Sequence, residues 1–129
     1  MNERKLIMCV EDDPDNARLI DFLLRRAPAD LVMTNRADDA AALWSGRRPD
    51  LILLDLVLPG SAGLDWLESL RRQETLAPTP VIIVSVRTDP EQLRRARELG
   101  SEYYVLKPFT PEVLREAIEK ALGVDWHEY

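Results

Sequence analysis

Short runs of mainly apolar residues recur along this chain, separated by longer segments with a different pattern. Each run is bounded by polar residues or proline. The runs are too short to form helices of their own. An unbroken apolar run is typical of a strand that is buried on both faces of a parallel sheet. The five predicted strands are residues 6–10, 31–34, 50–55, 81–84 and 103–106.

Between the strands, apolar residues recur every three or four positions, which is the spacing of one helix face. Three of these segments begin with a capping residue followed by proline: Asp13-Pro14, Asp89-Pro90 and Thr110-Pro111. The predicted helices are residues 15–27, a short segment between Asp38 and Gly46, and residues 64–71, 90–99 and 111–122.

The helix predicted over residues 90–99 differs from the others because its apolar stripe is narrow. Leu93, Ala96 and Leu99 are the apolar positions of that stripe. The charged residues between them are predicted to form a solvated face: Arg94, Arg95, Arg97 and Glu98.

The order of the elements predicts the fold class. Strands that alternate with helices imply right-handed crossovers and a parallel sheet covered on both sides. At 129 residues the chain is expected to be one domain, with a core that needs no disulfides. We therefore expect a doubly wound α/β domain with five parallel strands.

Composition excludes several classes of function. Seventeen basic and 23 acidic residues give a net charge of −6, which argues against direct binding of nucleic acid by this domain. Cys9 is the only cysteine, so there is no disulfide framework, and a reducing, cytoplasmic location is expected. No apolar run is long enough for a membrane span or a signal peptide. The glycine-rich loops that bind nucleotides are also missing from the sequence.

Asp55 is the first candidate for chemistry because it follows the apolar run Leu51 to Leu54 at its carboxyl end. Burying a carboxylate is costly unless it has a partner or a metal. In open α/β sheets, ligands bind outside the carboxyl ends of the strands. From this stretch alone, an aspartate that caps a turn is an equally good interpretation.

Three other strands also end in polar residues: Glu11-Asp12, Ser85 and Lys107. Carboxylates that lie close together repel one another, and a hard cation such as Mg²⁺ relieves that repulsion. Lys107 is placed to pair with Asp55 or with a phosphoryl oxygen, and Ser85 offers a hydroxyl donor to the same group. The set fits phosphoryl transfer to a carboxylate.

Taken together, these motifs resemble the response-regulator receiver domain of two-component signalling, which has the fold of the chemotaxis regulator. The resemblance covers residues 5–122 and implies a flavodoxin-like sheet with strand order 2-1-3-4-5. It also implies that residues 1–123 form the receiver domain and that residues 124–129 are a tail or the start of a linker. The matching motifs are Val10-Glu11-Asp12-Asp13-Pro14, the segment Asp55 to Gly60, Val84-Ser85, and the segment Tyr104 to Phe109.

The resemblance implies a role for each acid. Asp55 would accept a phosphoryl group from a histidine kinase or a phosphotransfer protein. Asp12 and Asp55 would bind Mg²⁺ directly, together with the backbone carbonyl of Val57. Glu11 would act on the metal through water.

It also implies roles for residues on the last two strands. Lys107 and Ser85 would hold phosphoryl oxygens, and the Lys107-Pro108 bond would be cis. Tyr104 would be a switch aromatic that turns inward when Ser85 moves toward the phosphate. Without the resemblance, Tyr104 is better interpreted as a half-buried strand residue and Lys107 as a solvated one.

Two features depart from the family pattern, one at residue 86 and one at the pair of residues 57 and 87. Val86 follows Ser85, where the family usually has a very small residue, and is expected to crowd the site. Val57 and Arg87 occupy positions that tune dephosphorylation. Because Val57 cannot orient an attacking water, the phosphorylated form is predicted to be long-lived.

We weighed three functions. The favoured one is a phosphorylation-controlled switch, not an enzyme, with a face formed by helix 90–99, strand 103–106 and helix 111–122. That face would act on a partner or an attached output domain, and it would also serve for a homodimer. The second is an aspartyl phosphohydrolase. That class of enzyme usually has a second acid two residues after the nucleophile and a substrate cap, whereas this chain has Val57 at that position and no room for a cap. The third is a receiver-like interaction module that works without phosphorylation.

Overall fold

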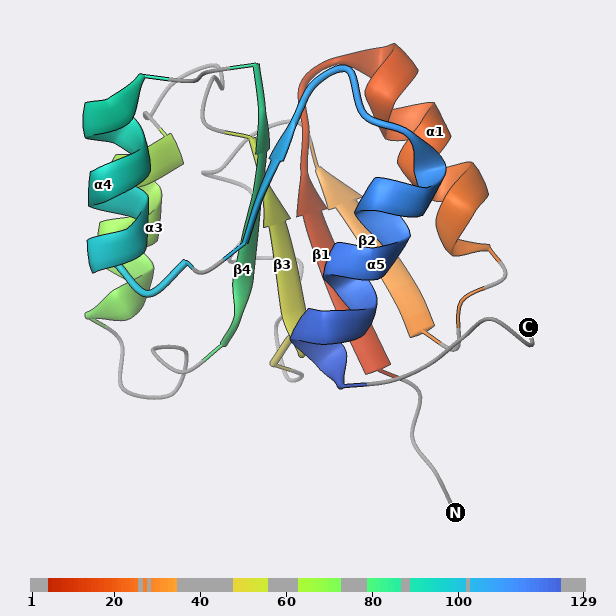
Figure 1. The fold of residues 1–129 in the computed structure, drawn as a ribbon. Helices are drawn as coiled ribbons and strands as arrows, with labels where there is room; N and C mark the ends of the chain where they lie inside the picture. The colour runs from red at the N-terminus through yellow and green to blue at the C-terminus, as the bar shows by residue number, and fades with distance from the viewer. Residues whose placement is uncertain are drawn as a thin grey trace.

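A five-stranded parallel sheet forms the centre of the protein, with the strand order β2-β1-β3-β4-β5 (Figure 1). The structure is a computed structural model that describes residues 5–25, 27, 29–34, 48–55, 63–72, 79–86, 89–101 and 103–123. The predicted strand order is confirmed. The strands are β1 (Lys5–Val10), β2 (Ala29–Thr34), β3 (Leu51–Leu54), β4 (Val81–Ser85) and β5 (Tyr103–Leu106).

Helices cover both faces of this sheet. Figure 1 shows α1 and α5 on one face and α3 and α4 on the other, which confirms the predicted doubly wound architecture. The helix predicted between Asp38 and Gly46 lies outside the described residues. None of the helices in the described ranges is both long and apolar enough to cross a membrane. Their bounds are α1 (Pro14–Leu24), α3 (Gly63–Arg71), α4 (Pro90–Glu98) and α5 (Pro111–Leu122).

The alternation of side chains along the central strands divides the core into two clusters. Ile7 and Cys9 of β1 face α1 and α5, and belong to a cluster with Ile20 of α1 and Leu114 of α5. The intervening residues Met8 and Val10 belong to the other cluster, which is completed by residues of α3 and α4. Because helices cover both faces, β3 is buried along its whole length.

The three predicted helix starts are confirmed. Asp13 Oδ1 accepts the N–H of Asp15 at 3.0 Å, and Asp89 Oδ1 accepts the N–H of Glu91 at 3.0 Å. Thr110 Oγ1 accepts the N–H of Val113 at 3.3 Å. Each cap satisfies a backbone donor in the first turn that has no partner within the helix.

The prediction that the first helix continues to residue 27 is wrong. α1 ends at Leu24, and the N–H of Arg25 is shared between the carbonyls of Asp21 and Phe22. Ala27 is nevertheless buried, and its N–H donates to Leu24 O at 3.1 Å. The apolar spacing therefore correctly predicted that Ala27 is a core residue, but Ala27 lies in the turn that follows α1 and not in the helix itself.

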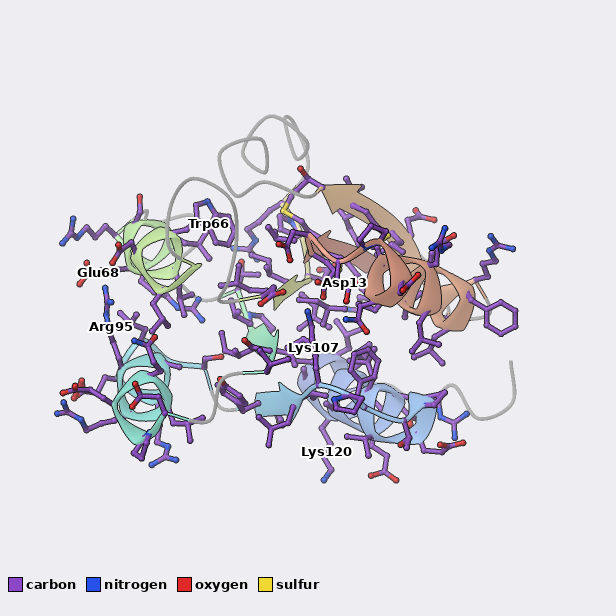
Figure 2. All side chains as sticks on the ribbon, turned by 90° about the horizontal axis from the view of Figure 1, so that it is seen from above. Asp13, Trp66, Glu68, Arg95, Lys107 and Lys120 are labelled. Carbon is purple, nitrogen blue, oxygen red and sulfur yellow. The ribbon has the colours of Figure 1, made fainter. Side chains whose placement is uncertain are left out.

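Arg95 is partly exposed, as predicted for the solvated face of this helix, but it also contacts the neighbouring helix. Its guanidinium reaches across to α3, where Nη2 lies 2.8 Å from Asp65 Oδ1 and 3.7 Å from Glu68 Oε2 (Figure 2). Arg94, Arg97 and Glu98 are exposed, as predicted. Helical periodicity could not distinguish Arg95 from these neighbours because its partners come from another helix.

Candidate functional site

The register of the parallel strands brings the predicted site residues to one edge of the sheet. The N–H of Asp55 donates to Val10 O at 3.0 Å, so the end of β3 lies beside the end of β1. The N–H of Lys107 donates to Ser85 O at 2.9 Å, which joins the ends of β5 and β4 in the same way. Figure 2 is viewed from this edge and shows Lys107 and Asp13 near its centre.

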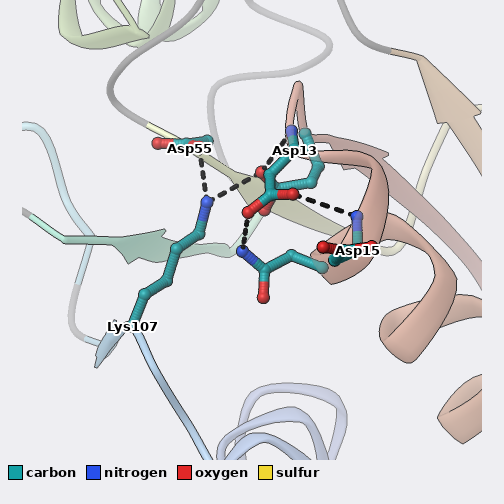
Figure 3. A network of polar contacts seen from close by, with 6 residues as sticks. Asp13, Asp15, Asp55 and Lys107 are labelled. Carbon is teal, nitrogen blue, oxygen red and sulfur yellow. Dashed lines mark hydrogen bonds and ion pairs between the residues drawn. The ribbon is translucent and has the colours of Figure 1, made fainter.

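Lys107 is the centre of the polar network at this edge (Figure 3). Its Nζ lies 2.7 Å from Asp55 Oδ2 and 2.7 Å from Glu11 Oε2. The side chains of all three residues are largely buried, with exposed fractions of 9% for Lys107, 4% for Asp55 and 1% for Glu11. Burial lowers the pKa of Lys107, but its hydrogen bonds to Asp55 and Glu11 outweigh that effect and raise the pKa overall. Lys107 is therefore a charged donor held against two carboxylates.

Three carboxylates meet around this lysine. Oxygens of Glu11, Asp12 and Asp55 all lie within 4.8 Å of one another, and they come from the ends of two neighbouring strands. Burial raises the pKa of Glu11 to about 7, although the hydrogen bond from Lys107 opposes the shift. Partial desolvation, followed by the negative charge of Asp55, raises the pKa of Asp12. Clustered oxygen donors with excess negative charge fit a hard divalent cation such as Mg²⁺.

The network opens onto a cleft of about 460 Å³. The lining of the cleft includes the acidic residues Asp12 and Asp55 and the apolar residues Val86 and Pro108. Val86 is 63% exposed, so its side chain lies at the cleft surface and not in the core. The Lys107-Pro108 peptide bond is cis, as the resemblance implied.

Ser85 and Tyr104 are not among the residues that line the cleft. Ser85 is fully buried at the end of β4. Tyr104 is half-buried on β5 and packs against the cluster formed with α3 and α4. Val57 and Arg87, for which roles in binding and dephosphorylation were predicted, lie outside the described residues.

Sequence reasoning missed two contacts of this site. Glu11 was assigned a role through water, whereas in the structure it also pairs directly with Lys107. Asn16 was not singled out, yet it lines the cleft and its Nδ2 donates to Asp13 Oδ2 at 2.7 Å. Its position three residues after the capping aspartate was the available signal, because the first turn of a helix faces its cap.

Comparison with known proteins agrees with this geometry. Residues 7–119 match the family model of the response regulator receiver domain. The chain is 38% identical over 120 residues to the chemotaxis protein CheY of Pseudomonas aeruginosa, covering 88% of this chain and 93% of CheY. It is 34% identical over 111 residues to the DNA-binding response regulator MtrA of Mycolicibacterium smegmatis, covering 86% of this chain. The chain spans about half the length of MtrA, with 47% of that protein matched.

A solved structure extends the comparison to the metal site. It is the receiver domain of a sensor histidine kinase from Pseudomonas aeruginosa, with a magnesium ion coordinated in its active-site cleft. Its TM-score with this protein is 0.82 at 25% sequence identity, over 94% of this chain and 99% of that one. From the matched span, the sequence relatives and the shared fold, we conclude that this chain belongs to the response regulator receiver domain family.

Proposed function

We propose that this domain is a phosphoacceptor switch in which Asp55 takes a phosphoryl group from a histidine kinase or a phosphotransfer protein. The observation that carries the proposal is the position of the Lys107 ammonium, 2.7 Å from Asp55 and 2.7 Å from Glu11 beside the three-carboxylate cluster. A buried carboxylate with a fixed cation next to it, open to a cleft, is a good acceptor because charge neutralisation provides most of the catalysis of phosphoryl transfer.

The transfer requires no other covalent chemistry from the protein. An oxygen of Asp55 attacks the phosphorus, the new O–P bond forms, and the P–N bond to the donor histidine breaks with its electron pair leaving on the imidazole nitrogen. Lys107 stays within reach of Asp55 and stabilises charge on a phosphoryl oxygen. The domain thus assists its own phosphorylation and dephosphorylation and acts as a signalling module, not as an enzyme with an external substrate.

Asp12, Asp55 and the carbonyl of Val57 would hold Mg²⁺ directly, and Glu11 would hold it through water. A bound Mg²⁺ would supply positive charge against the phosphoryl oxygens. The carboxylate cluster supports this assignment, as does the magnesium ion in the receiver domain of the Pseudomonas aeruginosa sensor kinase. Lys107 already balances part of the acidic charge, so the site is not purely acidic before the metal binds.

The signal would leave through the surface formed by α4, β5 and α5. Ser85 would move toward the phosphoryl group, and Tyr104 on the neighbouring strand would follow it inward. The N–H of Lys107 donates to Ser85 O, so the serine and the catalytic lysine already share a hydrogen bond across β4 and β5. We propose that a partner, an output domain attached to residues 1–123, or a second copy of the chain recognises this surface.

The test is intact mass after incubation with a small acyl phosphate and Mg²⁺, for the wild type, Asp55→Asn and Asp21→Asn. Asp21 is the matched control because it lies on α1 and pairs with Arg25, away from the cleft. We expect the wild type and Asp21→Asn to gain one phosphoryl group and Asp55→Asn to gain none. A folded wild type that gains none would overturn the proposal and favour an interaction module that works without phosphorylation.

We also propose that the phosphorylated form is long-lived. Hydrolysis needs a group that orients water for attack on phosphorus, and Val57 offers none. Loss of the phosphoryl group over time, followed by intact mass, should be faster in Val57→Asn than in the wild type. A wild-type half-life of only seconds, lengthened by this substitution, would contradict the idea.

A further inference from the structure

A fourth acid, Asp13, lines the same cleft as the proposed metal ligands but is not part of their carboxylate cluster. Asp12, Asp13 and Asp55 all contribute to the lining of the cleft. Among the described residues, the carboxylate group within 4.8 Å comprises Glu11, Asp12 and Asp55, without Asp13. A carboxylate this close to a cation site needs a reason not to join it, because each added oxygen ligand would gain contact with the metal.

The reason lies in the two hydrogen bonds that Asp13 accepts (Figure 3). Its Oδ1 accepts the N–H of Asp15 at 3.0 Å, which is the helix cap. Its Oδ2 accepts Nδ2 of Asn16 at 2.7 Å, and within the described ranges this is the one hydrogen bond to that oxygen. Asn16 therefore holds the half of the carboxylate that the cap does not use.

We propose that Asn16 is a positioning residue that keeps Asp13 out of the metal site and thereby makes the site select Mg²⁺ over Ca²⁺. This inference rests on the proposed function, because it assumes that Asp12 and Asp55 bind a divalent cation. Mg²⁺ is small, demands octahedral geometry and keeps several waters, so it suits a site with few carboxylates. Ca²⁺ takes six to eight oxygens in flexible geometry, so a fourth carboxylate would favour Ca²⁺.

The backbone around Asp13 is held independently of Asn16. The carbonyl of Asp13 accepts the N–H of Ala17 at 2.9 Å, and the N–H of Asp13 donates to Glu11 Oε2 at 3.1 Å. Loss of the Asn16 amide should thus free one carboxylate oxygen without displacing the peptide unit or the Glu11–Lys107 pair. We therefore expect loss of the Asn16 amide to change metal selectivity and not folding.

The experiment is calorimetric titration of Mg²⁺ and of Ca²⁺ into the wild type, Asn16→Ala, the double variant Asn16→Ala/Asp13→Asn, and Arg18→Ala. The Arg18 control removes an exposed pair with Asp15 on the same helix. In Asn16→Ala we expect the ratio of Ca²⁺ to Mg²⁺ affinity to rise about tenfold, because the affinity of a Ca²⁺ site depends on its number of charged ligands. Asp13→Asn should restore the ratio, since asparagine still caps the helix but adds no negative charge.

An unchanged ratio in Asn16→Ala, with the wild type binding Mg²⁺, would overturn this inference alone. A raised ratio that persists in the double variant would also overturn it, because Asp13 would then not be the cause. A folded wild type that binds neither cation would overturn the proposed metal site as well. The mass measurement on Asp55 distinguishes that failure from a loss of the acceptor role.

Discussion

Two helices on opposite faces of the sheet, α4 and α5, are attached to the protein by different forces. α5 buries Leu114 and Ile118 completely, and three more of its apolar residues pack against the same core cluster. α4 has a single buried residue, Ala96. The sheet therefore holds α5 through apolar contacts, whereas α4 has little apolar surface to bury.

Polar contacts from α3 replace the missing apolar contacts of α4. Arg95 on α4 reaches Asp65 on α3, and Arg71 at the end of α3 donates to the Leu99 carbonyl at 2.7 Å. Arg71 also donates to the Thr79 carbonyl just before β4. The polar contacts of α4 are exposed or only partly buried, whereas Leu114 and Ile118 of α5 are fully buried, so we expect α4 to open more readily than α5.

The largest expected effect comes from removing an apolar anchor of α5. Leu114→Ala should lower the free energy of unfolding by about 2–5 kcal/mol, because it leaves a cavity in the core. The matched change in α4, Leu93→Ala, should cost about 1 kcal/mol or less, since Leu93 is only partly buried. Urea unfolding of both variants measures the difference, and equal costs would refute the contrast.

Next in size is the loss of the Arg71 contacts. Arg71→Met removes the donor to two carbonyls, and we expect a loss of about 1–3 kcal/mol in the free energy of unfolding. Hydrogen exchange should show the loss of protection concentrated at the end of α4. Arg72→Met is the control because Arg72 is exposed. It should change stability by less than about 0.5 kcal/mol. A loss of protection spread evenly over the protein would mean that the Arg71 hydrogen bonds do not specifically hold the end of α4.

A smaller loss of stability is expected when the N-caps of α5 and α4 are removed. Both caps accept a backbone N–H through a side-chain oxygen, but α5 is held by buried apolar contacts and α4 mainly by polar ones. Thr110→Ala at α5 should lower the free energy of global unfolding by about 1 kcal/mol. Asp89→Ala at α4 should mainly promote local opening of that helix. The α4 amides should then exchange faster, while the free energy of global unfolding changes little. If both caps changed only the global transition, α4 would be as firmly attached as α5.

The smallest effect is expected at the Arg95–Asp65 pair. A double-mutant cycle with Arg95→Ala and Asp65→Ala should give a coupling of about 0.2–1 kcal/mol, as for other exposed ion pairs. The coupling should fall when salt is raised, because ions screen exposed charges. The Arg94–Glu91 pair within α4 is the control, since its loss does not separate α4 from α3. A coupling that is insensitive to salt would mean that Arg95 acts through packing.

Local sequence was enough to predict the strands and the helix starts. The apolar run Leu51 to Leu54 is too short for a helix and is bounded by prolines, which favours a buried strand. An aspartate before proline caps a helix through atoms only two residues away. The end of α1 was predicted less well, since Ala27 carries the helical spacing but packs from a turn. Periodicity records which residues face the core, not which backbone conformation brings them there.

The candidate site was predictable for a related reason. In parallel strands, polar residues that follow an apolar run lie at one edge of the sheet, so the pattern predicts that Glu11, Asp55 and Lys107 lie close together. The sequence did not predict that Lys107 would contact both acids at once. That contact depends on side chains that are 52 and 96 residues apart in the chain.

The sequence by itself determined the alternation of strands and helices, the helix caps and the sheet edge at which the charged residues collect. Each of these follows from interactions within a few residues or from burial of an apolar run. Only the tertiary structure decided which charges pair across elements: Lys107 with Glu11 and Asp55, and Arg95 with Asp65. Ion pairs between distant segments depend on distance and burial, and these are set only when the elements pack.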